Sequence, residues 1–231
     1  MTNKWVAVTG VSGFVGSHVA HALKSKGYRV LSLSRTVPSS PVDKHITLDI
    51  SDCMAMERIT AGLPELSCVV HVAASKKQDE SAITANVLGA YNVLKHLGKH
   101  TGNICNISSI PIIGVPEEEV ITEQHSVKPL SLYHLTKYQA EMLCELPEFR
   151  ELNISHLRFA SPIGVGMPMN VITSVFIANC LKNNPISINR KGERVMNYID
   201  TRDIAEAVIF VIKKIKVSGL FLLNGTSISN I

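Results

Sequence analysis

Three residues near the middle of the 231-residue chain have types that could carry out proton transfer: Ser109, Tyr133 and Lys137. Tyr133 and Lys137 are four positions apart, so both side chains would lie on one face of a helix. Because a nearby ammonium favours the phenolate, we expect Lys137 to lower the pKa of Tyr133. A tyrosine with such a pKa could act as a general acid or base near neutral pH. Ser109, at the end of a predicted strand, could hold a substrate oxygen beside it.

A glycine-rich segment near the start of the chain could hold phosphate groups. Gly10, Gly13 and Gly16 follow a predicted strand (4–8) and open a predicted helix (14–26). The first glycine permits a tight turn, the second lets the backbone approach a pyrophosphate, and the third lets the helix pack close to the strand. The free N–H groups at the start of the helix would then face the phosphates. This context predicts a site for NAD or NADP, and a purely structural turn is the alternative.

The residue that selects the ribose is expected at the end of the second strand, residues 29–34. An acid there would bind the ribose of NAD, whereas an arginine suits the 2′-phosphate of NADP. This strand ends in Ser34-Arg35 with no acid, so Arg35 favours NADP. The alternative is that Arg35 stacks on adenine or faces solvent. Asp49 is placed to meet the adenine, or else to cap a helix.

Apolar runs and helical patterns alternate along the chain, which predicts an α/β fold with a doubly wound parallel sheet, the Rossmann fold. Short and continuously apolar strands are typical of a parallel sheet that is covered on both faces. We expect residues 1–160 to form the NAD(P)-binding Rossmann domain. The predicted strands are 4–8, 29–34, 45–48, 68–72, 103–108 and 153–159, and the predicted helices are 14–26, 52–61, 80–97 and 131–146.

Residues 161–231 are expected to form a smaller, apparently truncated C-terminal substrate lobe, interleaved with the end of the Rossmann sheet. Glycines and prolines interrupt the chain just after residue 161. Further on, the pattern predicts helices at 171–182 and 201–215 and strands at 186–188 and 220–223.

The composition of the chain argues against several classes of protein. Charged residues make up 18% and apolar residues 45%, and the net charge is only +4, which argues against disorder and against nucleic acid as a partner. The five cysteines are scattered, so we expect free thiols in a reducing compartment and no metal site. No apolar run is long enough to span a membrane, and no signal peptide is visible. We therefore expect a cytoplasmic protein with no membrane partner.

Taken in chain order, these motifs resemble the extended short-chain dehydrogenase/reductase family, in its NAD-dependent epimerase/dehydratase branch. The similarity covers essentially the whole chain. The residues that carry it are Thr9-Gly10-x-x-Gly13-Phe14-x-Gly16, Asp49-Ile50, His71-Val72-Ala73-Ala74, Asn86, Ser108-Ser109 with Gly114, Tyr133-x-x-x-Lys137, Leu157-Arg158-Phe159 with Pro162 and Gly164, and Tyr198-Ile199-Asp200 with Asp203.

The resemblance implies roles for individual residues. Tyr133 would be the catalytic base, assisted by Ser109 and Lys137, and Asn86 would help to order the central strands. We interpret His71 as structural and His134 as exposed, off the catalytic face. The residues implied in cofactor binding are Gly10, Ser12, Gly13, Phe14, Val15, Gly16, Arg35, Asp49, Ile50, Ala73, Ala74, Lys76, Asn86, Tyr133, Lys137 and Phe159.

The chain departs from the family pattern at three places. Dehydratases of this branch carry an Asp-Glu pair directly after the catalytic hydroxyl residue, but here Ile110-Pro111 follows Ser109, so a 4,6-dehydratase is not expected. Met196 stands where many nucleotide-sugar enzymes have an arginine that meets a phosphate. Ser161 stands where many have an asparagine.

The function implied by the resemblance is that of an NAD(P)-dependent nucleotide-sugar 4-epimerase. Its substrate would be a small molecule, a UDP-sugar such as UDP-N-acetylglucosamine or UDP-glucose. One alternative is an NADP-dependent reductase of a keto-sugar or another carbonyl, which Arg35 and Met196 favour. Another is a non-catalytic NAD(P)-binding protein, which the early C-terminus favours and the intact Ser109, Tyr133 and Lys137 oppose.

The resemblance also makes a homodimer plausible, through the predicted helices 80–97 and 131–146. The apolar stripes of these helices could equally belong to the core of one chain.

Overall fold

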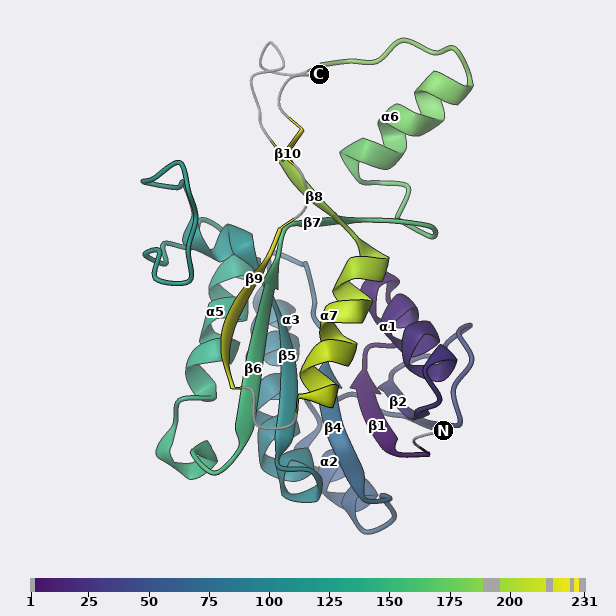
Figure 1. Ribbon diagram of the computed structural model, residues 1–231, viewed down its shortest axis with the longest axis vertical. Coiled ribbons are helices and arrows are strands. Elements are labelled where there is room, and N and C mark those ends of the chain that lie inside the picture. The colour runs from purple at the N-terminus through teal and green to yellow at the C-terminus, as the bar shows by residue number, and fades with distance from the viewer. Residues whose placement is uncertain (1–2, 189–195, 215–217, 225–226, 229–231) are drawn as a thin grey trace.

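The main feature of the computed structural model is a seven-stranded sheet in which every neighbouring pair of strands is parallel (Figure 1). The structure describes residues 3–188, 196–214, 218–224 and 227–228. The strand order is β3-β2-β1-β4-β5-β6-β9. The strands are β1 (Trp5–Thr9), β2 (Arg29–Ser34), β3 (Lys44–Thr47), β4 (Leu66–His71), β5 (Asn103–Ser109), β6 (Asn153–Phe159) and β9 (Gly219–Leu223).

Helices cover both faces of this sheet, so the predicted doubly wound Rossmann fold is confirmed (Figure 1). On one face, α1 (Phe14–Ser25) packs beside α7 (Thr201–Lys213). On the other lie α2 (Cys53–Thr60), a helical segment over residues 80–100, and α5 (Leu132–Leu143). The segment 80–100 contains α3 (Glu80–Ile83) and α4 (Gly89–Asn92), which are joined and followed by wider π-type turns at 84–88 and 93–97.

The sandwiched position of the sheet explains why its strands read as continuous apolar runs. Along β1, Val6 and Val8 belong to the core cluster beneath α1 and α7, whereas Ala7 belongs to the cluster on the opposite face. Successive side chains point to opposite faces of a strand, so both faces need apolar residues when both are covered.

The functional crevice is expected where the strand order reverses, between β1 and β4. After β1 the chain builds outward through β2 and β3, and after β4 it builds outward in the other direction through β5 and β6. The loops that leave the carboxyl ends of β1 and β4 therefore separate and leave a crevice between them.

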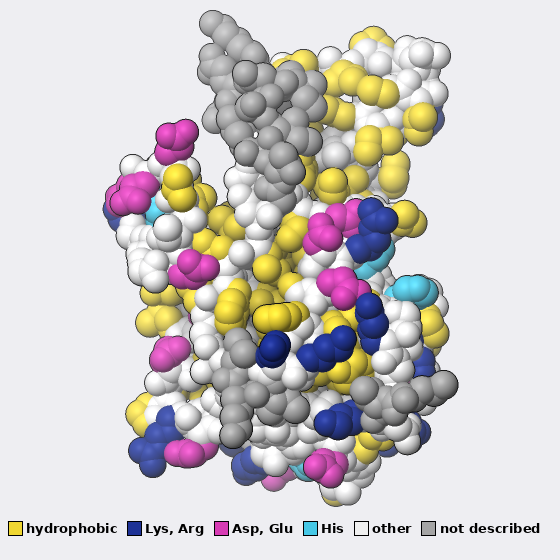
Figure 2. All heavy atoms as spheres, viewed as in Figure 1, with side chains coloured by type: hydrophobic (Ala, Val, Ile, Leu, Met, Phe, Trp, Pro, Cys, Tyr) yellow, Lys and Arg dark blue, Asp and Glu magenta, His cyan; other side chains and the backbone are white. Residues whose placement is uncertain are grey.

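A small second sheet lies beyond the carboxyl ends of the central strands. Strand β8 (Met196–Asp200) pairs in parallel with β7 (Ser161–Ile163) and antiparallel with β10 (Ser227–Ile228). Helix α6 (Ile172–Leu181) stands beside it, and Figure 2 shows hydrophobic side chains gathered over this helix. The division into domains at residue 160 stays a prediction, although β9 and α7 do return to the main sheet.

The prediction of a strand at 186–188 is wrong. Residues 184–188 have no regular secondary structure, and Ile186 and Ile188 are 37% and 52% exposed. No described strand pairs with them, and a short alternating pattern does not make a strand without a partner. The helix predicted at 201–215 is α7, which ends at Lys213, and residue 215 lies outside the described part of the chain.

Candidate active site

A cleft of about 750 Å³ opens at the carboxyl ends of the central strands. It is lined by the glycine loop after β1, the loops after β2 to β5, the start of α5, and residues of the small second sheet and its connections. The predicted site residues that line it are Gly10, Ser12, Gly13, Phe14, Val15, Gly16, Arg35, Asp49, Ile50, Ala73, Ala74, Lys76, Ser109, Tyr133, Lys137 and Phe159. Of the predicted set, Asn86 does not line the cleft.

The glycine loop has the shape that a dinucleotide pyrophosphate requires. Gly10 has a φ of +71°, and a Cβ at this position would lie 2.8 Å from the Cα of Ala73. Gly13 begins α1 with an extended backbone and no capping side chain. The N–H groups of the first turn of α1 are therefore directed toward the cleft for an anionic ligand. These residues fit the pyrophosphate of NAD or NADP.

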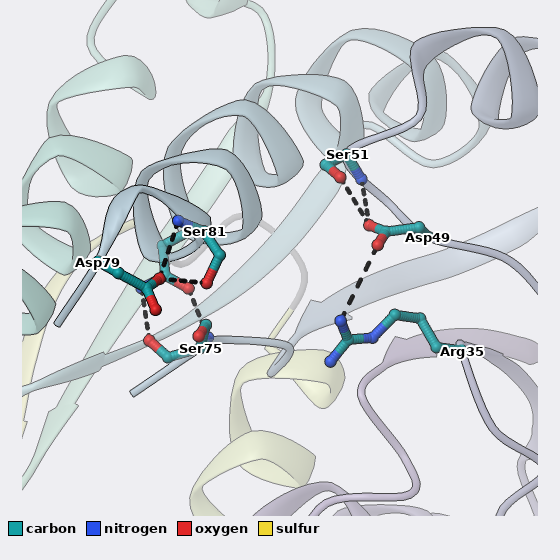
Figure 3. Close-up of polar contacts among 7 residues, drawn as sticks. Arg35, Asp49, Ser51, Ser75, Asp79 and Ser81 are labelled. Carbon is teal, nitrogen blue, oxygen red and sulfur yellow. Dashed lines mark hydrogen bonds and ion pairs between the residues drawn. The ribbon is translucent and has the colours of Figure 1, made fainter. Parts of the chain in front are cut away.

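At the adenine end of the cleft, Asp49 is held by its neighbours (Figure 3). Its Oδ1 accepts hydrogen bonds from the Ser51 backbone N–H at 2.9 Å and from the Ser51 hydroxyl at 2.7 Å. Arg35 Nη1 lies 4.0 Å from Asp49 Oδ2. Burial opposes ionisation of Asp49, but the bonds from Ser51 and the charge of Arg35 together lower its pKa. Since the Arg35 side chain is 76% exposed, its ion pair is weak and its guanidinium could turn to a ligand phosphate.

Helix α5 brings Tyr133 and Lys137 to the cleft on the same side. The helix begins after Ser131, whose hydroxyl accepts a hydrogen bond from the His134 N–H at 3.3 Å. Lys137, one turn further on, is only 2% exposed. Ser109 comes from the carboxyl end of β5, the strand on which α5 packs. The three predicted catalytic residues thus line one cleft together.

Burial sets the pKa values of Tyr133 and Lys137, and the pKa of Tyr133 differs from the expectation. Burial lowers the pKa of Lys137 to about 8, with a partial offset from Glu141. Burial raises the pKa of Tyr133 to about 12. The predicted lowering of the Tyr133 pKa is therefore wrong for the protein alone, because burial removes water from the phenolate and so disfavours the charged form.

A buried ion pair stands behind Lys137 and fixes α5 to the sheet. Arg158 on β6 donates from Nε to Glu141 Oε1 at 3.0 Å and from Nη2 to Oε2 at 2.6 Å. The side chains are 6% and 7% exposed, respectively. Such a two-bond pair sets the orientation of the helix as well as its distance from the strand.

Asn86 lies beside the cleft wall and holds the loop that forms it. Its Oδ1 accepts from the Ser75 N–H at 2.6 Å, and its Nδ2 donates to the Ser75 carbonyl at 2.9 Å and to Thr136 Oγ1 at 2.9 Å. Asn86 therefore connects the loop after β4 to α5. Direct contact of Asn86 with a cofactor stays a prediction.

His71, at the end of β4, has a defined proton position. The Thr9 hydroxyl oxygen accepts from the N–H groups of Val72 and Ala73, both at 3.1 Å, so its own proton is donated to His71 Nδ1 at 2.9 Å. The ring proton is then on Nε2. Burial and the charge of Lys137 lower the pKa of His71 to about 3, so the ring is neutral. This agrees with a structural role in joining β1 to β4.

The expectation that His134 points away from the site is wrong. His134 lines the cleft and is half-buried, and its Nδ1 lies 2.9 Å from Ser131 Oγ. Its ring centroid is 5.3 Å from that of Tyr133. The cleft extends around the first turn of α5, so neighbouring side chains border it as well as those at helical spacing. Other lining residues that the sequence reasoning missed include Gln78, Ser131, Thr173 and Tyr198.

All five cysteines are free. Among the described residues, no group of His, Cys, Asp and Glu side chains is arranged to hold a metal ion. No described helix is both long enough and apolar enough to cross a membrane.

Comparison with known proteins places this geometry in a family. The chain is 26% identical over 219 residues to a putative UDP-glucose 4-epimerase of Methanocaldococcus jannaschii, a match that covers 87% of this chain and 71% of the relative. It is 25% identical over 229 residues to a probable UDP-glucuronate 4-epimerase of Rhizobium meliloti, covering 87% of this chain and 66% of the relative. In fold it matches a UDP-glucose 4-epimerase of Thermotoga maritima solved with UDP-glucose, with a TM-score of 0.83, 24% identity and coverage of 97% of this chain and 78% of the other.

The family of NAD-dependent epimerases and dehydratases matches residues 6–221, which is nearly the whole chain. This match includes the glycine loop, Ser109, Tyr133 and Lys137. The chain belongs to the NAD-dependent epimerase/dehydratase family.

Proposed function

We propose that this protein is a nucleotide-sugar 4-epimerase that uses NAD or NADP and retains it between turnovers. The observation that carries the proposal is the presence of Ser109, Tyr133 and Lys137 in one cleft with the glycine loop. Ile110-Pro111 after Ser109 offers no acids for the loss of water, which favours an epimerase over a dehydratase. The relatives named as UDP-sugar 4-epimerases support the substrate class.

In this proposal the glycine loop binds the cofactor pyrophosphate, Asp49 and Ile50 flank the adenine, and Lys137 holds the nicotinamide ribose. The bound cofactor supplies reversible hydride transfer at C4 of the sugar. Tyr133 takes the proton of the C4 hydroxyl as this carbon is oxidised, and it returns a proton when the carbon is reduced on its other face. Ser109 donates a hydrogen bond to the C4 oxygen and keeps it within reach of Tyr133.

The protein must offset the energetic cost of ionising Tyr133. Burial raises the pKa of Tyr133 to about 12, so the phenolate is unfavourable at neutral pH. Lys137 has a pKa of about 8 and therefore remains mainly an ammonium at neutral pH. In this proposal its charge stabilises the phenolate that forms during proton transfer, in a cleft where water screens it poorly.

The test is a direct assay of C4 inversion with UDP-glucose and UDP-N-acetylglucosamine. We expect inversion by the wild type and its loss in Tyr133→Phe, which keeps the ring and removes the hydroxyl. Tyr138→Phe is the matched control, because Tyr138 is on the same helix and packs against the core instead of lining the cleft. A protein that binds a UDP-sugar but never inverts C4 would contradict the proposal.

A second candidate function is an NADP-dependent carbonyl reductase, and Arg35 is the observation that favours it. The guanidinium lies at the adenine end of the cleft, and the carboxylate of Asp49, 4.0 Å from it, is held by Ser51. It could therefore meet a 2′-phosphate. A reductase consumes one NADPH for each carbonyl reduced, whereas an epimerase leaves the cofactor unchanged after each cycle. Arg35→Ala should weaken binding of NADP far more than binding of NAD if Arg35 has this role.

A further inference from the structure

One side of the cleft next to Tyr133 is polar. Lys76 and Gln78 come from the loop after β4, and Ser131 and His134 come from the start of α5. We call these four residues the polar rim. Elsewhere the lining of the cleft is largely apolar, and its residues there include Pro162, Met167, Pro168, Val171, Ile172 and Met196. A polar substituent of a substrate bound at Tyr133 would therefore be accommodated on the side of the polar rim.

Hydrogen bonds join the two halves of the polar rim. Gln78 Oε1 accepts from the Leu132 N–H at 3.1 Å, which fixes the loop to the first turn of α5. Ser131 Oγ accepts from the His134 N–H at 3.3 Å and lies 2.9 Å from His134 Nδ1. The ring of His134 is thus oriented through Nδ1, and Nε2 is the nitrogen that would meet a ligand. Groups held in this way are preorganised for recognition.

The polar rim is suited to an anionic group. Burial and the nearby ammonium of Lys76 lower the pKa of His134, so its ring is neutral at neutral pH. The Ser131 proton is available for Nδ1, which leaves His134 Nε2–H as a donor. Among the described residues that line the cleft, the one carboxylate is Asp49, at the adenine end. Beside Tyr133 the polar rim therefore offers an ammonium and an N–H donor with no competing acid.

We infer that Lys76 and His134 form a subsite for a carboxylate carried by the sugar ring, so that a nucleotide-linked hexuronate is preferred over a neutral hexose. This inference rests on the proposed C4 epimerisation. In a hexuronate the carboxylate is attached to C5, the carbon next to C4. A group that binds it must therefore lie beside the base that serves the C4 hydroxyl, and the rings of His134 and Tyr133 are 5.3 Å apart.

The experiment compares UDP-glucuronate with UDP-glucose. The kcat/KM for C4 inversion of each is measured for the wild type, His134→Ala, His134→Gln and His21→Ala. The wild type should prefer UDP-glucuronate, and His134→Ala should lower this preference about tenfold, the effect of losing one hydrogen bond to a charged group. His134→Gln should keep part of the preference, because its amide can donate. His21 is exposed on α1 and does not line the cleft, so His21→Ala is the matched control.

Two results would overturn the proposed subsite and leave the proposed function standing. One is a wild type that prefers UDP-glucose, and the other is a preference for UDP-glucuronate that is unchanged in His134→Ala. Calorimetric titration of UDP-glucuronate into folded His134→Ala provides a second measurement, and an unchanged Kd would also overturn the subsite. Circular dichroism verifies that the variant is folded. A wild type that inverts neither sugar would instead remove the proposed function, and the subsite with it.

Discussion

At the scale of single residues, the buried ammonium of Lys137 lowers the free energy of unfolding of the protein. Burial lowers its pKa from 10.5 to about 8, so the unfolded chain holds this proton more tightly than the folded protein does. This pKa difference corresponds to a destabilisation of at most about 3 kcal/mol, which is fully present below pH 8 and disappears as the pH rises above 10.5. We expect Lys137→Met to stabilise the protein at pH 7 by up to this amount while abolishing turnover.

Urea unfolding of the wild type and Lys137→Met, at neutral pH and near pH 10.5, measures this effect. The gain in the free energy of unfolding should shrink at the higher pH, because Lys137 is then neutral in the folded protein and about half neutral in the unfolded chain. A variant that is less stable than the wild type at pH 7 would show that the ammonium is well solvated or paired in the folded protein.

Replacing one partner of the ion pair Glu141–Arg158 should lower the stability of the protein more than replacing both. Arg158→Met leaves a buried carboxylate without its two hydrogen bonds, and removing one partner of such a pair costs about 3–5 kcal/mol. The double variant Glu141→Met/Arg158→Met removes both charges of the pair and should be clearly more stable than either single variant. Chemical unfolding of all four proteins tests this, and purely additive losses would contradict it.

The sequence correctly predicted the position of residues that local spacing fixes. The glycine loop and the Tyr133–Lys137 pair line the cleft together, because turn geometry and helical period fix their relative positions. It failed for His134, because the boundary of the cleft depends on how the loop after β4 meets α5. It also failed for the pKa of Tyr133, because burial is a tertiary property that spacing does not contain.

At the scale of elements, Asn86 joins the loop after β4 to α5. Asn86→Ala would leave the Ser75 N–H and carbonyl without these bonds, at a cost of about 1–3 kcal/mol for each buried group. We expect a lower melting temperature and a lower kcat, because this loop lines the cleft beside Tyr133. Asn179→Ala, on α6, is the control. An Asn86→Ala variant with normal kcat and stability would show that the connection to α5 has no effect on the site.

The central strands could be predicted almost to the residue, and β2 and β6 match the predicted bounds. Strands buried on both faces are continuous apolar runs, which is a strong local signal. The small second sheet could not be predicted. Ser161–Ile163 and Met196–Asp200 form strands because each is the other's partner, and short segments of this kind have no pattern of their own.

At the scale of the whole molecule, two helical elements expose apolar side chains that a second copy could cover. Leu135 and Met142 on α5 are 41% and 54% exposed, and Ile83 and Leu88 in the segment 80–100 are 47% and 43% exposed. The predicted homodimer would bury this surface. Met142→Glu should then shift the mass measured by light scattering from dimer to monomer. A wild type that is monomeric at high concentration would contradict the dimer.

In the proposed epimerase the cofactor is unchanged after each catalytic cycle. The measurement that tests this follows C4 inversion of a UDP-sugar by NMR and nicotinamide absorbance in the same sample. An epimerase that retains its cofactor should give many inverted sugars for each protein molecule, with no net oxidation or reduction of the nicotinamide. Consumption of one NADPH per sugar, or binding of the sugar with no inversion at all, would contradict it.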